Sequence, residues 1–282
     1  MLRQQRTNAG VHRLLTGATV LDLSHQWFPG MPVAPVHMPY MFSLVRRHGD
    51  VPRDDGVCTA NEVIIFSGHT GTHIDALGHV SSHGKLAGGL DASATQTGGS
   101  GLKDLGVEQV GPIVTSGVLL DVAGLKGVSC LPPEYEITPA DLEAAEEAAG
   151  VRVGPDDAVL IRTGWASRWP DQEQFVNNAG GTPGPGLAAA NWLADRQVVA
   201  TGTDTLVYEV VRPAGNVRPV HARLLVEAGI YIFETLNLED LARTGVHSFV
   251  FVAAPLKLAG ATASPISPLA IFWPEPGQED ES

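Results

Sequence analysis

Short apolar runs of strand length are the feature that most limits how this chain can fold. They are rich in valine, leucine and isoleucine, and each is bounded by glycine, proline or polar residues, which is typical of β-strands. The runs are Ala18–Leu23, Asn61–Ser67, Ser116–Val122, Ala158–Thr163, Val198–Gly202, Ile230–Glu234 and His247–Ala253. We therefore expect a β-sheet to form the framework of the fold.

Helical signals lie between the later runs. The capping sequence Thr138-Pro139-Ala140-Asp141 begins one helix, which ends at Gly150. A second helix is predicted over Leu187–Ala194, and a third over Pro219–Ala228 with Gly229 as its end. The order is strand-rich at the front and strand–helix–strand at the back, which indicates an α/β or α+β domain with a mixed sheet.

A single domain is expected to span the chain. A length of 282 residues fits one large domain or two small ones, and the sequence has no visible repeat or interdomain linker. We expect a flexible arm over residues 1 to about 16 and an acidic, solvated tail over residues 273–282. The glycine-rich stretch Gly84–Gly101 is predicted to be a long loop, of the kind that often serves function or assembly.

The composition argues against several kinds of partner and compartment. The net charge of −13 disfavours binding to nucleic acid or anionic lipid, because both are negatively charged. Cys58 and Cys130 are the only cysteines, too few for a disulfide framework or a cysteine-based zinc site, and they fit a reducing compartment. The sequence has no signal-peptide pattern at its start and no apolar run of the roughly 18 residues that a membrane helix needs. We therefore expect a soluble, cytoplasmic protein.

The segment Ser67–Val80 holds His69, His73 and His79, three of the chain's ten histidines, around Asp75. Imidazole and carboxylate groups together suit a borderline divalent cation, zinc or manganese. Three protein ligands that include a carboxylate leave a coordination position for water, as in catalytic sites. The alternative is a polar turn whose histidines only make hydrogen bonds, but the density of the cluster favours a metal site.

The spacing of the cluster requires a bend in the chain. His69 and His73 would lie about 13 Å apart on an extended strand, which is too far for two bonds of about 2.0–2.1 Å to one ion. A helix would place them on one face, but Gly71 between them makes a helix the poorer choice. We expect the apolar run Glu62–Phe66 to be a strand that ends in a turn at Gly71, which places the cluster at a strand end.

The sequence from His69 to His79, HTGTHIDALGH, resembles the signature His-x-Gly-Thr-His-x-Asp-x-Pro-x-His. This signature marks the metal-dependent cyclase family, which includes bacterial kynurenine formamidases and isatin hydrolases. The match holds at every position relevant to the metal. Leu77 replaces the signature proline and Val80 replaces the phenylalanine that usually follows. Proline donates no ligand, so these departures bear on substrate fit rather than on metal binding.

Weaker similarities follow the family's order along most of the chain. They are Leu21–His25, Gly30–Val33, Ile161–Trp165, Gly202–Thr205, His221 with Phe233–Thr235, and Ser264-Pro265, after which the usual arginine is absent. The resemblance implies an α/β fold of the swivelling β/β/α type with a mixed central sheet. It also implies a homodimer or homotetramer in which N-terminal segments and loops are exchanged between subunits.

The resemblance further implies a set of metal ligands. His69, His73 and Asp75 are expected to bind a first ion, and Asp75 can bridge to a second ion held by His221 and Glu234. Each subunit would hold one or two Zn²⁺ or Mn²⁺ ions, and the presence of Glu234 favours two. Without the resemblance, His221 could be a surface residue at a helix start and Glu234 an exposed acid at a strand end.

By the same resemblance, His79 is the expected catalytic residue, which takes a proton from water and then gives one to the leaving amine. A further metal ligand, or a group that orients a ligand, is the alternative role for His79. Trp27 is a candidate substrate-binding residue that could stack on a planar substrate, with simple packing as its alternative. His83 is given no role.

Together these residues and the resemblance imply a metal-dependent hydrolase that acts on a small-molecule amide. It would open the C–N bond of a cyclic amide (isatin- or lactam-like) or of an aryl formamide, through a metal-bound hydroxide. The alternatives are a lactone hydrolase or a cyclase with the same metal centre, or a non-catalytic metal-binding assembly protein. The sequence has no Gly-x-Ser-x-Gly motif of a serine hydrolase and no Walker A motif.

Overall fold

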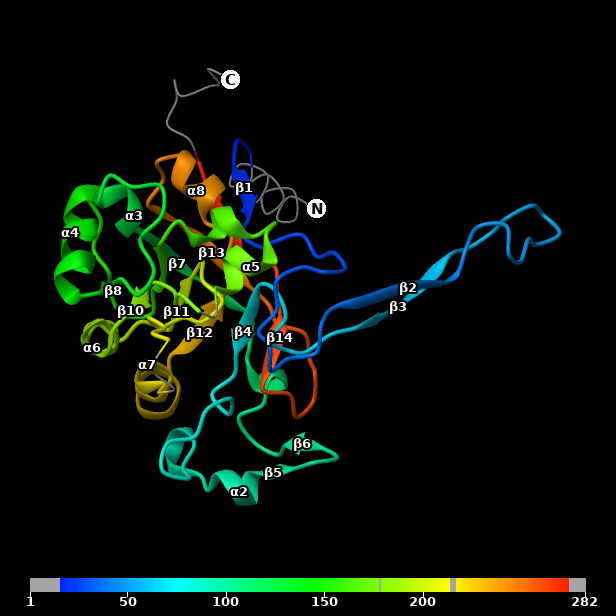
Figure 1. Ribbon diagram of the computed structural model, residues 1–282, viewed down its shortest axis with the longest axis horizontal. Coiled ribbons are helices and arrows are strands. Elements are labelled where there is room, and N and C mark those ends of the chain that lie inside the picture. The colour runs from blue at the N-terminus through cyan, green and yellow to red at the C-terminus, as the bar shows by residue number, and fades with distance from the viewer. Residues whose placement is uncertain (1–15, 178, 214–216, 274–282) are drawn as a thin grey trace, which may run out of the picture.

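A mixed nine-stranded sheet is the centre of the part of the chain that the computed structural model describes, which is residues 16–177, 179–213 and 217–273 (Figure 1). From edge to edge, its strands are β1 (Thr19–Asp22), β15 (Leu269–Phe272), β13 (Ser248–Ala253), β7 (Ile113–Asp121), β9 (Ala158–Arg162), β11 (Ala200–Thr203), β12 (Tyr231–Glu234), β4 (His73–Asp75) and β14 (Ala263–Pro265). The prediction of an α/β domain with a mixed central sheet is confirmed.

The four central strands β7, β9, β11 and β12 run parallel, and the pairs towards both edges are antiparallel. Parallel neighbours need crossover connections, and the predicted helices lie in those connections. All five residues of β9 are buried. Its residues 158–161 are therefore continuously apolar, because a strand covered on both faces has no polar side to alternate with. The fifth residue, Arg162, is buried in ion pairs with Asp121 and Glu239.

Helices cover one face of the sheet (Figure 1). They are α3 (Val122–Leu125), α4 (Pro139–Ala149), α6 (Leu187–Asp195), α7 (Pro219–His221) and its continuation η4 (Ala222–Ala228). Val159 and Ile161 of β9 pack into the core on this helical side, together with Leu142 and Leu193. Leu160 points to the opposite face, as strand alternation requires, and packs into a second core with residues such as Phe251.

The limits of the first predicted helix are confirmed. Thr138 and Asp141 form a capping box at the start of α4, and Gly150 ends it in a left-handed conformation with φ of 66°. The third predicted helix ends at Gly229 as expected, but only its first three residues are α-helical. Residues 222–228 form a π-helix, a rare form that is frequent at functional sites.

The predicted strand over Asn61–Ser67 forms as β3 (Asn61–Ile65) but does not join the central sheet. It pairs with β2 (Met41–Arg46), a strand that the sequence patterns did not indicate, in a hairpin that extends far from the body of the molecule (Figure 1). Every residue of both strands is exposed, although most are apolar. We call the two strands and the turn between them, residues 41–65, the hairpin arm.

Short elements complete the described part of the fold. They are η1 (Ala87–Gly89), α2 (Ala92–Thr95), β5 (Gln96–Thr97), β6 (Gly101–Leu102), η2 (Val107–Gln109), β8 (Glu136–Ile137), η3 (Trp165–Arg168), α5 (Gln172–Val176), β10 (Gly184–Pro185) and α8 (Glu239–Arg243). The predicted loop Gly84–Gly101 therefore contains two short helices, η1 and α2, and half of a small hairpin. Its sequence has little periodicity because these elements are only two to four residues long.

Two expectations concern the ends of the chain. The predicted arm over residues 1–16 and the tail over 273–282 lie outside the described residues, except for Thr16 and Trp273. In the part of the chain that the structure covers, no helix combines the length and the apolar character that crossing a membrane requires.

Candidate metal centre

Strand β4 places two of the predicted ligands on one face of the sheet. His73 and Asp75 are two residues apart on this strand, so their side chains point the same way. β4 pairs with β12 in a register that sets His73 opposite Glu234. As a result, Nε2 of His73 lies 3.3 Å from Oε2 of Glu234, although the two residues are far apart in the sequence.

The turn before β4 brings His69 back to the same face. Gly71 has a φ of +58°, a left-handed conformation that side chains rarely tolerate. A Cβ at this position would also lie 2.5 Å from Nε1 of Trp27, so only glycine fits. The predicted bend at Gly71 is confirmed. It follows the end of β3 rather than ending a strand of the central sheet.

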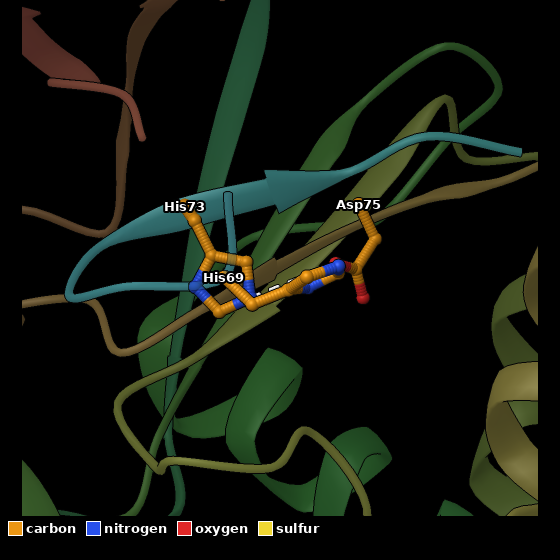
Figure 2. Close-up of side chains that lie close together, drawn as sticks. All are labelled: His69, His73 and Asp75. Atoms are coloured by element: carbon orange, nitrogen blue, oxygen red, sulfur yellow. Dashed lines mark ion pairs between the residues drawn. The ribbon is translucent and has the colours of Figure 1, made fainter. Parts of the chain in front are cut away.

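His69, His73 and Asp75 converge on one point (Figure 2). Nδ1 of His69 lies 3.0 Å from Oδ1 of Asp75, and Nε2 of His73 lies 3.6 Å from the same oxygen. His73 and Asp75 are buried, and the His69 side chain is 10% exposed. The potential ligand atoms of these three residues are within 4.8 Å of one another, which is the spacing that a single bound cation requires.

The second carboxylate oxygen of Asp75 faces a second group. Oδ2 lies 3.8 Å from Nε2 of His221 and 4.0 Å from Nε2 of His79, and these three residues also have ligand atoms within 4.8 Å. Nε2 of His221 lies 3.1 Å from Oε1 of Glu234. Asp75 is therefore shared by two possible cation positions, and Glu234 connects His73 with His221.

Three of the imidazoles, those of His69, His73 and His221, are held through the outer nitrogen of the ring. Nε2 of His69 is 3.0 Å from Oγ1 of Thr262, Nδ1 of His73 is 2.8 Å from the carbonyl oxygen of Gly71, and Nδ1 of His221 is 2.6 Å from Oε1 of Glu209. The carbonyl of Gly71 and the carboxylate of Glu209 can only accept hydrogen bonds, so Nδ1 of His73 and of His221 carries a proton, and Nε2 of each ring faces the carboxylates of the cluster as the nitrogen that could bind a cation.

The donor set fits a divalent cation. Among the described residues, neither oxygen of Asp75 accepts a hydrogen bond of good geometry, and Nε2 of His73 has no such partner. A fully buried carboxylate without donors is costly unless it is paired or coordinates a metal. Nitrogen and oxygen ligands in this combination suit zinc or manganese rather than calcium or magnesium.

The pKa values of the residues in the cluster are shifted in different directions. Burial alone would raise the pKa of Glu234, but His221 and His73 hold that pKa well below its ordinary value. Burial would lower the pKa of His221, but hydrogen bonds with Glu209 and Glu234 raise it to about 10. Burial lowers the pKa of His79 to about 4. At neutral pH, His79 is therefore the neutral imidazole that can accept a proton.

The positions of His79 and Trp27 do not decide between the two roles that the sequence analysis allowed for each. His79 is 27% exposed, more than the other residues that face Asp75, and its ring centre is 4.1 Å from that of His69. This position suits proton transfer with solvent, and it also suits a ligand. Trp27 does not join the ligand cluster. It packs on Gly71 and makes edge contacts with Tyr40 and Phe66.

Three residues around the cluster were missed by the sequence patterns. Glu209 and Thr262 hold His221 and His69 through their outer nitrogens, and His37 stacks on His69 with ring centres 5.2 Å apart. His37 also lines a cavity of about 650 Å³ between residues 33–39 and α5. None of these residues lies in a motif, so only spatial proximity reveals them.

The model of the Cyclase family, described as "Putative cyclase", matches residues 21–210. The isatin hydrolase of Roseibium aggregatum is 27% identical to this chain over 220 residues, which cover 77% of this chain and 76% of that protein. The family match over residues 21–210 includes His69, His73, Asp75 and His79. His221 and Glu234 lie beyond the family match.

Solved structures extend the likeness to nearly the whole chain. A crystal structure of a novel cyclase is 29% identical, has a TM-score of 0.83, and is matched over 93% of this chain and 89% of that one. The structure of a "predicted metal-dependent hydrolase" from Bacillus stearothermophilus is 26% identical, has a TM-score of 0.58, and is matched over 90% of this chain and 98% of that one.

Proposed function

Because the chain belongs to the Cyclase family, we propose that it is a metal-dependent hydrolase that opens a C–N amide bond in a cyclic amide or an aryl formamide. The relatives support the coarser statement, a metal-dependent hydrolase or cyclase. The likeness to an isatin hydrolase supports the finer one, because isatin is a cyclic amide.

The observation that carries the proposal is the environment of Asp75. This carboxylate is fully buried, its oxygens accept no hydrogen bond of good geometry from the described residues, and four imidazoles surround it. The arrangement is poor for a purely structural residue and good for a bridging metal ligand. We propose that His69, His73 and Asp75 hold one Zn²⁺ or Mn²⁺ ion, and that Asp75, His221 and Glu234 hold a second.

A cation at this site would lower the pKa of water and polarise a carbonyl group. The protein's own contribution is proton transfer. His79 is neutral at pH 7, partly exposed and next to Asp75, so its free nitrogen can accept a proton from water and return it to the departing amine. Glu234 and Asp75 supply negative charge that balances the cations and keeps His73 and His221 in place.

Substrate contacts are proposed beside the Gly71 turn. Trp27 is the proposed substrate-binding residue, since its half-buried indole covers the Gly71 turn between two ligands and lines a cavity of about 550 Å³ with residues such as Ser24 and Ile266. A planar amide could stack on this ring.

We also propose that the chain assembles with further copies of itself. The hairpin arm exposes Phe42, Leu44, Val63 and Ile64 on both of its strands. An extended, two-stranded segment with an apolar surface is marginal by itself in water. A second copy of the chain that covers this surface would explain its composition.

The test is a metal analysis of the purified full-length protein together with an amide panel. The panel holds isatin, N-formylkynurenine and a bicyclic γ-lactam, each with added Zn²⁺ or Mn²⁺. The same measurements are made on His73→Ala, and on His247→Ala as the control, since the Leu119 carbonyl is the one contact that the structure gives for the His247 side chain. We expect the wild type and the control to bind metal and hydrolyse at least one amide, and His73→Ala to lose both properties.

The outcomes separate the alternatives. If His73→Ala keeps both its metal content and its rate, the site assignment is wrong. Turnover of a lactone but of no amide would favour the lactone hydrolase or cyclase. Metal uptake without turnover of any substrate would favour a non-catalytic binding protein.

A further inference from the structure

We propose that Glu209 is the positioning residue that presents Nε2 of His221 to a second cation. The proposal rests on the proposed function, because it concerns a ligand of that metal centre. Glu209 contacts Nδ1 of His221, whereas Nε2 is the nitrogen that faces Asp75 and Glu234, so the expected effect of Glu209 acts through His221 rather than through direct coordination.

The first support is the contact between the two side chains. Oε1 of Glu209 lies 2.6 Å from Nδ1 of His221, and both residues are buried. When Nδ1–H donates to this carboxylate, the lone pair of the neutral ring is on Nε2. That nitrogen points to the other side of the ring, 3.1 Å from Oε1 of Glu234 and 3.8 Å from Oδ2 of Asp75.

The second support is that Glu209 also fixes the backbone that carries His221. The backbone N–H of Val220 donates to Oε2 of Glu209 at 3.1 Å, and the backbone N–H of His221 lies 3.4 Å from Oε1. The residue before α7, Arg218, makes no side-chain cap. Glu209 therefore performs the capping at this helix start, and one carboxylate sets both the position and the rotation of the imidazole.

The third support is the rigidity of the segment that holds Glu209. The backbone N–H of Val210 donates to the carbonyl of Pro185, and a Cβ on Gly184 would lie 2.6 Å from the backbone carbon of Glu209. Tyr208, the residue before Glu209, donates its backbone N–H to Oε1 of Glu234 at 2.7 Å. Residues 208 and 209 thus hold Glu234 and His221, the two residues that would complete the second cation position.

The experiment measures Zn²⁺ stoichiometry and affinity by competition with a chromophoric chelator, on the full-length chain. The variants are Glu209→Ala and Glu209→Gln, with His221→Ala as the reference for a lost ligand. Glu146→Ala is the matched control: Glu146 is equally buried and accepts a backbone N–H, that of Val153, but lies outside the cluster. A second readout follows the ring proton on Nδ1 of His221 by ¹⁵N-edited NMR in metal-free protein.

We expect the second Zn²⁺ to bind about 10- to 100-fold more weakly in Glu209→Ala, as is typical when a group that orients a metal-bound histidine is removed. The first ion and the Glu146→Ala control should keep wild-type affinity. Glu209→Gln should show a smaller loss, because its amide oxygen can still accept one of these hydrogen bonds. Some loss is expected because the neutral oxygen is a weaker acceptor and the amide NH₂ group would face an N–H donor. The Nδ1 proton of His221 should be protected from solvent exchange in the wild type and unprotected in Glu209→Ala.

Wild-type affinity for the second ion in both Glu209 variants would overturn the proposal while leaving the metal centre intact. If Glu209→Ala does not fold, Glu209→Gln decides by the same criterion. If the wild-type protein takes up no second ion, the two-ion part of the proposed function fails, and the protection of the His221 ring proton decides the positioning role: unchanged protection in Glu209→Gln and Glu209→Ala would refute it.

Discussion

At the scale of single residues, the molecule places its most costly groups around one point. Asp75 and Glu234 are buried carboxylates, and His73 and His221 are buried imidazoles, in a protein interior that disfavours every charge among them. They are tolerated because each balances another and because the outer nitrogens of the rings are tied. The site therefore depends on a complete set of partners, and removal of one member leaves the others unpaired.

His79 is the residue whose role a single substitution can decide. Replacement by glutamine removes the proton-accepting nitrogen but retains a polar side chain of similar length. If His79 transfers protons, His79→Gln should lower the rate of amide hydrolysis by about 10²- to 10⁴-fold and retain the metal content of the wild type. The measurement is kcat together with metal analysis of the same sample. Loss of an ion in parallel with the rate would instead make His79 a ligand of the second group.

Asp204 is a second buried carboxylate, and its role is structural. Oδ1 accepts hydrogen bonds from the backbone and the hydroxyl of Thr163, and Oδ2 accepts one from the backbone of Gly164. These bonds tie the end of β11 to the end of β9 beside it. Burial nevertheless raises the pKa of Asp204 from 3.8 to about 6.

A pH dependence of stability follows from that shift. Since the folded state binds this proton more tightly than the unfolded state, protonation contributes stability that is fully present below about pH 3.8 and is lost as the pH rises through 6. Asp204→Asn has no titrating carboxyl at this position and therefore lacks this pH-dependent contribution to stability. We therefore expect the difference in unfolding free energy between the wild type and Asp204→Asn to be larger at pH 4.5 than at pH 7.5, by about 2 kcal/mol. Denaturant unfolding at both pH values measures it; equal differences would contradict the expected titration.

At the scale of elements, strand pairing decides which side chains meet. β4 has only three residues, and its position between β12 and β14 brings Glu234 to His73. The end of β12 is held in place by Thr72, whose hydroxyl donates to the carbonyl of Thr235 at 2.6 Å. Thr235 has a φ of +58°, which is a true outlier for a β-branched residue and costs about 1–3 kcal/mol. The surrounding hydrogen bonds maintain this conformation directly after a potential metal ligand.

The hairpin arm gives a prediction about assembly. Phe42 and Ile64 are opposite each other on β2 and β3 and are 45% and 44% exposed. If a second copy covers this surface, the double variant Phe42→Lys/Ile64→Lys should convert the oligomer to a monomer, because two buried charges would oppose association. Size-exclusion chromatography with light scattering measures the mass, and circular dichroism checks the fold.

The matched control for this experiment is Val128→Lys, which introduces one lysine at a 41% exposed apolar residue outside the hairpin arm. It should leave the mass unchanged. A monomeric wild type, or a double variant that keeps the wild-type mass, would show that the arm serves another purpose.

At the scale of the whole molecule, metal binding and stability should be linked. The proposed ligands come from the turn before β4, from β4 itself, from α7 and from β12, so a bound cation would join segments from the front and the back of the chain. A ligand that binds only the folded state at 100 times its dissociation constant stabilises that state by about 2.7 kcal/mol.

We therefore expect added Zn²⁺ to raise the melting temperature of the chelator-treated wild type by several degrees, and to have little effect on His73→Ala. Differential scanning fluorimetry with and without chelator measures the change. An equal rise in both proteins would place the stabilising ion away from His73.

The sequence by itself determined the parts of this protein that depend on neighbouring residues. Six of the seven apolar runs became strands of the central sheet, and the caps at Thr138 and Gly150 limited α4 as expected. The bend at Gly71 followed from the same local reasoning, since the spacing of His69 and His73 left no straight alternative. Such features are set within a few residues by backbone sterics, side-chain periodicity and local hydrogen bonds.

Only the tertiary structure decided the rest. Glu209 and Thr262 belong to no recognisable pattern, yet they hold two of the imidazoles. Residues 61–65 read as an ordinary strand, but the structure gives them one partner, β2, and places both in the exposed hairpin arm. The physical reason is the same in each case: contacts between distant residues depend on the register and neighbours of whole strands, and a sequence pattern records which face of an element is apolar but not what will lie against it.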